Sequence, residues 1–307
     1  MSISLLKLKL FVSVYQEGSM SGAAERVNAT QSGVSMHIRQ IEKRYGVELF
    51  DRKSSGVVPT EAGKVFYSYA SKVLHSAIDA EQILTELSGT ISGHVRLGLM
   101  PTFTRTILAP VIVRLKEEAP HIRLSVTEAY SGILSTQVVD GRLDLAIVPA
   151  DSSGLNLDIK TMGRDTECLV CAADRNLVKE NGAVLSRLPP LNYVLPSAEN
   201  ARRDGIDKYL SINNIKVGEI LELDAMFATL ELVAESDQVA ILPGILCGPD
   251  LDGKVRQVSP LANPPLHTEY VRVTPKSQSL SGAAQLVSDM LQDELKKALK
   301  ITPVSAR

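Results

Sequence analysis

Residues 19–44 constrain the fold of this chain more than any other stretch. Two short helical patterns are separated there by Asn28, a residue type that enters the left-handed backbone region at low cost and can therefore form the turn between them. Thr30 supplies an N-cap for the second helix, whose apolar residues recur at helical spacing as Val34, Ile38 and Ile41. The stretch predicts a helix-turn-helix over about 20–39, although an ordinary amphipathic helix pair has the same local pattern.

The outward face of the second helix is short, polar and partly basic. Glutamine can bond bidentately to adenine, and serine and arginine can contact base edges or phosphates. The residues on this face are Gln31, Ser32, Ser35 and Arg39. Arg52 and Lys53 follow at the base of a predicted wing, where they either contact backbone phosphates or remain solvated surface charges. We expect a winged helix-turn-helix DNA-binding domain over 1–59.

The charge distribution agrees with this assignment. The net charge of the whole chain is only −2, which is not typical of a protein that coats nucleic acid. Residues 1–58, however, carry eight Lys and Arg side chains against five acidic ones, so the basic part of the chain is its N-terminal part.

A long helix without internal proline is predicted over 60–88, followed by a hinge over 89–93. Its apolar residues alternate spacings of four and three through three heptads, which is the period of a coiled-coil seam. The seam residues are Phe66, Val73, Ala77, Leu84 and Leu87. A seam of this length needs a partner helix, so we expect a homodimer; the alternative is a partner helix in the C-terminal region of the same chain.

Strand-like and helix-like runs alternate over 94–300, which favours a parallel α/β sheet. Two similar halves are expected, one of about 94–163 with 270–300 and one of about 164–269, with a cleft between them. The predicted fold class is therefore α/β, with an N-terminal all-α winged helix-turn-helix and a long linker helix.

Taken together, the motifs of the chain resemble the LysR-type transcriptional regulators. Those motifs are Phe11, Gly18-Ser19, Ala23-Ala24, Gln31, Val34-Ser35, Ile41-Glu42, Leu49-Phe50-x-Arg52, Pro59-Thr60-Glu61-Ala62-Gly63, Gly93 to Gly98, Pro120, Gly141-Arg-Leu-Asp-Leu-Ala and the segment ending at Pro243. The C-terminal part is most similar to the nitrogen-assimilation-control branch. Two departures are Ser32 with Gly33, where the family commonly has proline after the glutamine, and Glu235 to Gln238, which replace a later Gly-x-Gly.

The resemblance implies a regulator that binds double-stranded promoter DNA, contacts RNA polymerase and assembles as a homotetramer from two dimers. It adds Ser19 to the expected DNA-contacting residues. It also implies that the C-terminal region is a periplasmic-binding-protein-like fold of two subdomains, whose cleft holds a small-molecule co-inducer. Effector binding would then shift the halves and reset the spacing of the DNA-binding domains.

Polar residues follow predicted strand ends, where open α/β sheets bind ligands. The expected effector contacts are Thr102, Ser131, Gly132, Ser197, Arg203 and Asp224. They fit a small organic or aromatic acid. Thr102, Ser131 and Asp224 are alternatively N-caps, and Arg203 alternatively pairs with Asp207 on its own helix.

Several other functions find little support in the sequence. The chain lacks phosphate-binding glycine motifs and a nucleophile elbow, and its five histidines have no ligand spacing, so we expect neither an enzyme nor a bound cofactor or metal. Cys168-x-x-Cys171 invites a redox interpretation, but on a strand the two side chains point to opposite faces. With no apolar run of about 18 residues, we expect a cytoplasmic protein without a membrane span. The competing hypothesis is a DNA-binding regulator whose C-terminal domain only drives oligomerisation.

Overall fold

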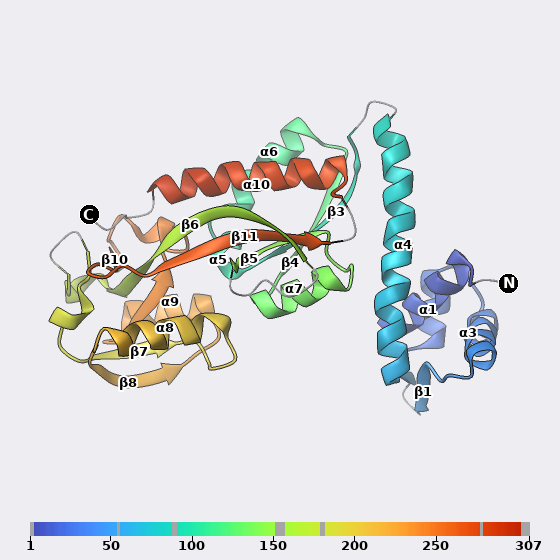
Figure 1. The fold of residues 1–307 in the computed structure, drawn as a ribbon, viewed down its shortest axis with the longest axis horizontal. Coiled ribbons are helices and arrows are strands. Elements are labelled where there is room, and N and C mark those ends of the chain that lie inside the picture. Colours follow the sequence, from blue (N-terminus) through green and yellow to red (C-terminus); the bar gives the residue numbers. More distant parts are fainter. Residues whose placement is uncertain are drawn as a thin grey trace. The chain divides into compact units, whose positions relative to one another are not determined.

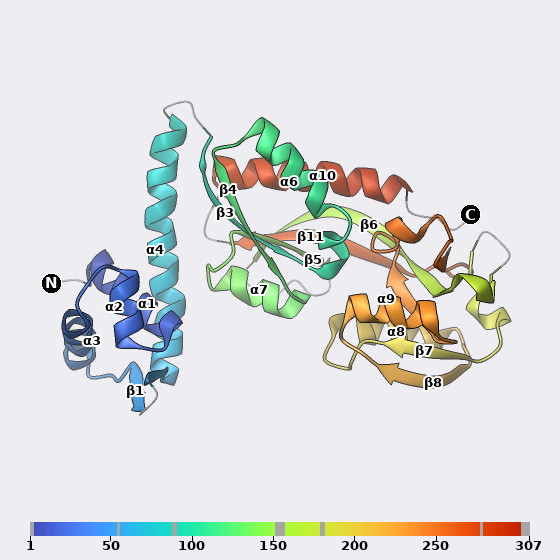
Figure 2. The same ribbon diagram turned by 180° about the vertical axis from the view of Figure 1, so that it is seen from behind.

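The chain forms two compact units. One comprises residues 1–90 with 140–142, and the other residues 91–139 with 143–307. The computed structural model describes residues 3–53, 56–87, 91–150, 157–178, 182–276 and 279–301 (Figures 1 and 2). Among these residues, no helix is both long enough and apolar enough to cross a membrane.

Three helices form the core of the N-terminal unit: α1 (Leu5–Glu17), α2 (Met20–Arg26) and α3 (Gln31–Tyr45). Between α2 and α3, Asn28 adopts a φ of 52°, which confirms the predicted turn residue. Thr30 caps α3 by accepting a hydrogen bond from the Gly33 amide at 3.2 Å, again as predicted. The apolar stripe of α3 is buried in one core with Phe11, so the opposite face of α3 is turned to solvent.

A two-stranded wing and the start of the long helix close this unit. The wing pairs β1 (Phe50–Lys53) antiparallel with β2 (Gly56–Pro59). At the start of α4 (Glu61–Leu87), Thr60 accepts a hydrogen bond from the Gly63 amide at 3.0 Å and donates one to the Glu48 carbonyl at 2.7 Å. A Cβ at Gly63 would lie 2.1 Å from the Leu49 carbonyl oxygen, so only glycine permits this close approach.

The seam predicted on α4 needs correction. Phe66 packs against the N-terminal core, where the centroid of its ring lies 4.6 Å from that of Phe11. Val73 and Leu84 are 47% and 70% exposed, Ala77 is half-buried, and the side chain of Leu87 lies outside the described part of the structure. The exposed apolar stripe instead begins at Val65 and Tyr69, because the first turns of α4 use their Phe66 side to cover α1.

The C-terminal unit is built on one mixed sheet, whose strands run in the order β4-β3-β5-β11-β6-β9-β7-β8, with β10 also paired to β6. These strands are β3 (Gly93–Leu99), β4 (Ile122–Glu128), β5 (Leu145–Pro149), β6 (Leu157–Ala172), β7 (Leu191–Leu195), β8 (Val217–Glu222), β9 (Val239–Pro243), β10 (Arg256–Pro260) and β11 (His267–Pro275). The helices are α5 (Pro101–Thr104), α6 (Leu108–Glu118), α7 (Ser131–Val139), α8 (Ala201–Ile212), α9 (Met226–Glu235) and α10 (Gly282–Ile301). Residues 89 and 90 of the predicted hinge lie outside the described part, as does residue 88 at the end of the predicted helix, and Gly93 already begins β3.

The first half of this sheet is covered on both faces. In Figures 1 and 2, α6 and α10 lie on one side of β3, β6 and β11, and α7 lies on the other side. A Cβ at Gly98 in β3 would lie 2.9 Å from a methyl group of Leu134, so glycine lets α7 pack directly on the strand. The two helix layers bury a continuous apolar core around β3 and β5.

The second half is also a sandwich, and its two cores follow from the alternation of side chains along β7. Tyr193 and Leu195 share a core with Ile206 of α8, whereas Val194 shares the other core with Leu230 of α9. Because successive strand residues point to opposite faces, α8 and α9 cover opposite faces of the sheet.

The sheet is mixed, not parallel as predicted. β3 is parallel to β4 and β5, and β7 is parallel to β8 and β9, but β11 runs antiparallel to β5 and β6. β6 and β11 pair from Leu157 opposite Pro275 to Thr166 opposite His267, so the boundaries predicted near Gly163 and Tyr270 fall inside continuous strands. The alternation of strands and helices along a sequence does not show in which direction each strand runs in the sheet. The long strands β6 and β11 pass from one half of the unit to the other and so join the halves.

Candidate nucleic-acid interface and effector cleft

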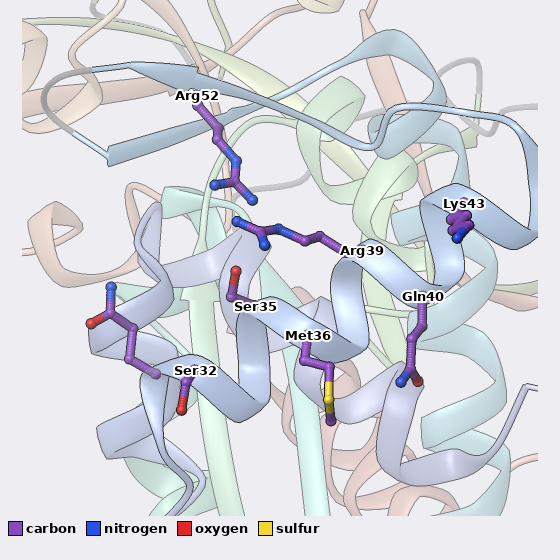
Figure 3. A pocket seen from close by; sticks show the side chains of 8 residues that line it. Ser32, Ser35, Met36, Arg39, Gln40, Lys43 and Arg52 are labelled. Atoms are coloured by element: carbon purple, nitrogen blue, oxygen red, sulfur yellow. The ribbon is translucent and has the colours of Figure 1, made fainter.

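The solvent face of α3 forms a groove of about 590 Å³ with the wing. Its lining residues are Gln31, Ser32, Ser35, Met36, Arg39, Gln40, Lys43 and Arg52 (Figure 3). Five predicted DNA-contacting residues are thus brought together, and the groove also contains Met36, Gln40 and Lys43, which were not among the predicted residues. Continuing the helical spacing from Ser32 and Arg39 would have found them.

Two predicted residues stand apart from this groove. Ser19 is the N-cap of α2, and its hydroxyl accepts a hydrogen bond from the Gly22 amide at 2.9 Å. Lys53 is exposed at the end of β1 and is not a lining residue. Ser19 therefore has a structural role in shaping the helix-turn-helix.

Arg39 and Arg52 extend toward each other across the groove, one from α3 and the other from the wing (Figure 3). Neither guanidinium forms an ion pair with a carboxylate among the described residues. Two converging cations without a counter-charge are suited to an external anion, and a planar guanidinium can donate two parallel hydrogen bonds to phosphate.

The predicted effector residues occupy strand ends, but the N-cap alternatives are wrong for three of them. Thr102 is buried as the second residue of α5, which begins after Met100, and Ser131 is the buried first residue of α7, beside exposed Gly132. Asp224 precedes the cap position of α9, which Ala225 occupies.

Asp224 instead holds the loop between β7 and α8. One of its carboxylate oxygens accepts hydrogen bonds from the Ser197 amide and the Asn200 side-chain amide, each at 3.2 Å. The hydrogen bond from the Ser197 side chain contributes most to lowering the pKa of Asp224 below its usual value. Ser197 is thereby tied to Asp224 within its own half.

Arg203 pairs with Asp207 on its own helix, which was the alternative to an effector contact. It donates to both carboxylate oxygens of Asp207, at 2.8 and 2.9 Å, and to Glu222 at 2.8 Å. The guanidinium of Arg203 also donates a hydrogen bond to the Pro196 carbonyl at 2.8 Å. Arg203 does not line either of the two cavities that lie beside the neighbouring Arg202.

The neighbouring Arg202 is the arginine that lies between the two halves. Its side chain is 12% exposed and donates to the 3%-exposed Glu167 at 2.6 Å and to the Ile241 carbonyl at 3.1 Å. Glu167 also accepts a hydrogen bond from Thr268 of β11 at 2.8 Å. The Nε of Arg202 is buried and has no hydrogen-bond partner among the described residues, so one donor of this buried cation is unused.

Arg202 lines two small cavities. One, of about 130 Å³, lies between the end of β5, α8 and β11; the other, of about 20 Å³, lies between Tyr130 and the residues around α9. The Tyr130 hydroxyl donates a 2.6 Å hydrogen bond to the Asp224 carbonyl, which joins the first half of the unit to the second.

The cavity-lining residues are sequence neighbours of those predicted. The cavities are lined by Tyr130, Pro196, Arg202 and Leu223, whereas the residues predicted from the sequence are Ser131, Ser197, Arg203 and Asp224. Successive helical residues point about 100° apart, so only the packed structure shows which of Arg202 and Arg203 points inward.

Several buried ionisable side chains lie along β6. Asp165 accepts hydrogen bonds from the amides of Ile245 at 2.9 Å and Thr166 at 2.8 Å, and burial raises its pKa to about 7. Burial also raises the pKa of the Cys168 and Cys171 thiols. These two cysteines lie in different cores on opposite faces of β6, as the strand geometry predicted, so they cannot act as a pair.

Comparisons with known proteins agree with this architecture. The chain matches the bacterial regulatory helix-turn-helix protein, lysR family, over residues 5–64 and the LysR substrate binding domain over residues 88–296. The nitrogen assimilation regulatory protein Nac of Escherichia coli is 25% identical, with 93% of each chain covered.

Solved structures share the fold. A full-length OxyR variant from Pseudomonas aeruginosa has a TM-score of 0.76 and 19% identity, covering 100% of this chain and 99% of its own. Full-length CbnR complexed with its target DNA has a TM-score of 0.64 and 16% identity, covering 96% and 100%. With a helix-turn-helix whose α3 face is free and a two-halved α/β unit, the chain belongs to the LysR family of DNA-binding transcriptional regulators.

Proposed function

We propose that this regulator contacts promoter DNA through the α3 groove and responds to a small organic acid bound beside Arg202, between the halves of its C-terminal unit. The observation that carries the DNA contact is the convergence of Arg39 and Arg52, neither of which has a carboxylate partner in the described part of the chain. A phosphate between them would fix the position of α3 in a major groove, because phosphate contacts orient a protein on the duplex.

Replacing Arg39 or Arg52 with alanine should weaken binding to operator and to random DNA by similar factors. The slope of log affinity against log salt should also fall by about one, as expected on losing one phosphate contact. Fluorescence anisotropy at several salt concentrations measures both effects. Arg44→Ala is the control, since Arg44 is an exposed α3 arginine outside the groove. A loss confined to operator DNA would instead make the residue a base contact.

Arg202 supports the effector assignment. It is a buried cation with an unused Nε donor, at the edge of a 130 Å³ cavity and on the joint between the halves. A carboxylate is the group best suited to that donor. An acid that binds one arrangement of the halves more tightly than another would shift the equilibrium between them and so alter DNA binding.

A thermal-shift screen of the full chain against small carboxylates and amino acids tests this assignment. A ligand that binds only the folded protein should raise the unfolding temperature in a saturable way. We expect Arg202→Lys to weaken that ligand about tenfold or more, because lysine has no Nε donor and no planar fork. Arg203→Lys should respond like the unmodified protein. An equal response of both variants would place the ligand elsewhere.

One observation favours the competing function, in which the C-terminal unit only assembles oligomers. The Tyr130–Asp224 contact already spans the halves, and the space beside Tyr130 is only about 20 Å³. No saturable shift with any acid, combined with unchanged DNA binding in their presence, would support that function.

We also propose that the exposed stripe of α4 pairs with the same stripe of a second chain, that two such dimers form a homotetramer, and that the DNA-bound assembly contacts RNA polymerase. The exposed Val65, Tyr69, Val73 and Leu84 support the pairing, since a long apolar helix face is stabilised by burial against another helix.

A further inference from the structure

Met36 differs in kind from every other side chain in the α3 groove. It is 50% exposed, and it is the only apolar residue among the eight that line the groove in the described part of the chain. It does not belong to the N-terminal core, whose α3 members are Val34, Ile38 and Ile41. Packing into the described N-terminal core therefore does not explain a large apolar side chain at this position.

The position of Met36 on α3 is central. At about 100° per residue, it lies about 200° around the helix from Val34, nearly opposite the buried stripe. Ser32 and Gln40 flank it one turn before and one turn after on the same face (Figure 3). Arg39 and Arg52 lie to one side of Met36, so they do not cover it (Figure 3). A surface that binds the exposed face of α3 therefore contacts Met36 directly.

The chemistry of the major groove supplies a partner for such a side chain. Base edges there present hydrogen-bond donors and acceptors, and thymine alone among the four standard bases adds an apolar group, its C5 methyl. Methionine is unbranched and polarisable, so it can adapt its shape to a small methyl group. The neighbouring amide of Gln40 has the donor and acceptor pair that suits adenine, so a thymine contact and an adenine contact are compatible on one turn of α3.

We propose that Met36 is a specificity-determining residue that packs against the C5 methyl group of a thymine in each half-site of the operator. This inference rests on the proposed insertion of α3 into the major groove. In this proposal the groove contains two kinds of side chain with different roles. Arg39 and Arg52 contact phosphates and position the helix, and Met36 contacts a base and determines which base is preferred.

Replacing single thymines by deoxyuridine tests the contact, because it removes only the methyl group. An operator is first selected from a random duplex library with the full-length protein, and each thymine of a half-site is then replaced in turn. The unmodified protein should lose about fourfold in affinity at one thymine, the effect of one buried methyl group. Met36→Gln, which keeps the side-chain length but removes the apolar end, should bind the parent operator about fourfold more weakly and be indifferent to deoxyuridine at that thymine.

Met36→Leu serves as the matched control and should retain the dependence on the methyl group. Since Met36 is exposed and outside the core, its variants should unfold at the same temperature as the unmodified protein. A selected half-site without thymine, or equal deoxyuridine effects in the unmodified protein and Met36→Gln, would overturn the proposal. If Arg39→Ala still weakens binding in that case, insertion of α3 stands and only the methyl contact falls; if neither residue affects binding, the proposed groove itself is wrong.

Discussion

Replacing Arg202 by alanine is expected to lower the free energy of unfolding of the C-terminal unit by about 3–5 kcal/mol, the usual result of removing one partner of a buried ion pair. Glu167 is 3% exposed, and without Arg202 its charge would keep, among the residues that the structure describes, only the 2.8 Å hydrogen bond from Thr268. Hydrogen exchange of peptides from β6 and α8, followed in increasing denaturant, measures the loss locally in a protein of two units.

The adjacent Arg203→Ala is the matched control. Its partners Asp207 and Glu222 are about half exposed, so losing these pairs should cost about 0–1 kcal/mol. A loss below about 1 kcal/mol for Arg202→Ala as well would contradict the buried pair and mean that Glu167 finds another partner or is solvated.

Replacing Val73 by lysine is expected to split the dimer and to weaken operator binding by about 10²–10⁴-fold, because two linked half-site contacts would become one. Val73 is 47% exposed on the apolar stripe of α4, and a lysine facing its own copy brings two positive charges into an apolar seam. Sedimentation equilibrium gives the assembly state, and anisotropy gives the affinity.

Ile78→Lys is the control for this substitution. Ile78 is 48% exposed on the same helix, but at about 100° per residue it lies on a different face from the stripe through Tyr69 and Val73. It should leave both assembly and affinity intact. Dimers that persist with Val73→Lys would show that α4 does not carry the self-association.

The solvent-exposed face of α3 could be predicted because its cause is local. Asn28 sets the turn, Thr30 caps α3, and the spacing of Val34 and Ile38 decides which face is buried, so the remaining residues must face outward. The same logic failed for Phe66, which carries the heptad period but is used by the core around Phe11. A periodic pattern shows that a residue is buried without showing against which element.

The cleft could be predicted only to within a residue or two. Strand ends placed the candidates near Thr102, Ser131 and Arg203, but the inward side chains are Tyr130 and Arg202. One residue on a helix changes direction by about 100°, and the sequence offers two adjacent arginines with nearby acids for each. Packing against β6 decides that Arg202 is buried with Glu167 while Arg203 stays with Asp207.

By itself, the sequence determined the elements whose signals are short-range: the helix-turn-helix, the wing, the long helix and the alternation of strands and helices. Only the tertiary structure decided strand direction, the continuous β6 and β11 that join the two halves, and the buried pair between Arg202 and Glu167. The physical reason is range. Helix caps, turns and hydrophobic periodicity depend on residues that are close together in the chain. The antiparallel pairing of β6 with β11 and the contact of α8 with β6 join residues that are far apart in the chain, and the energies of these interactions depend on the assembled core.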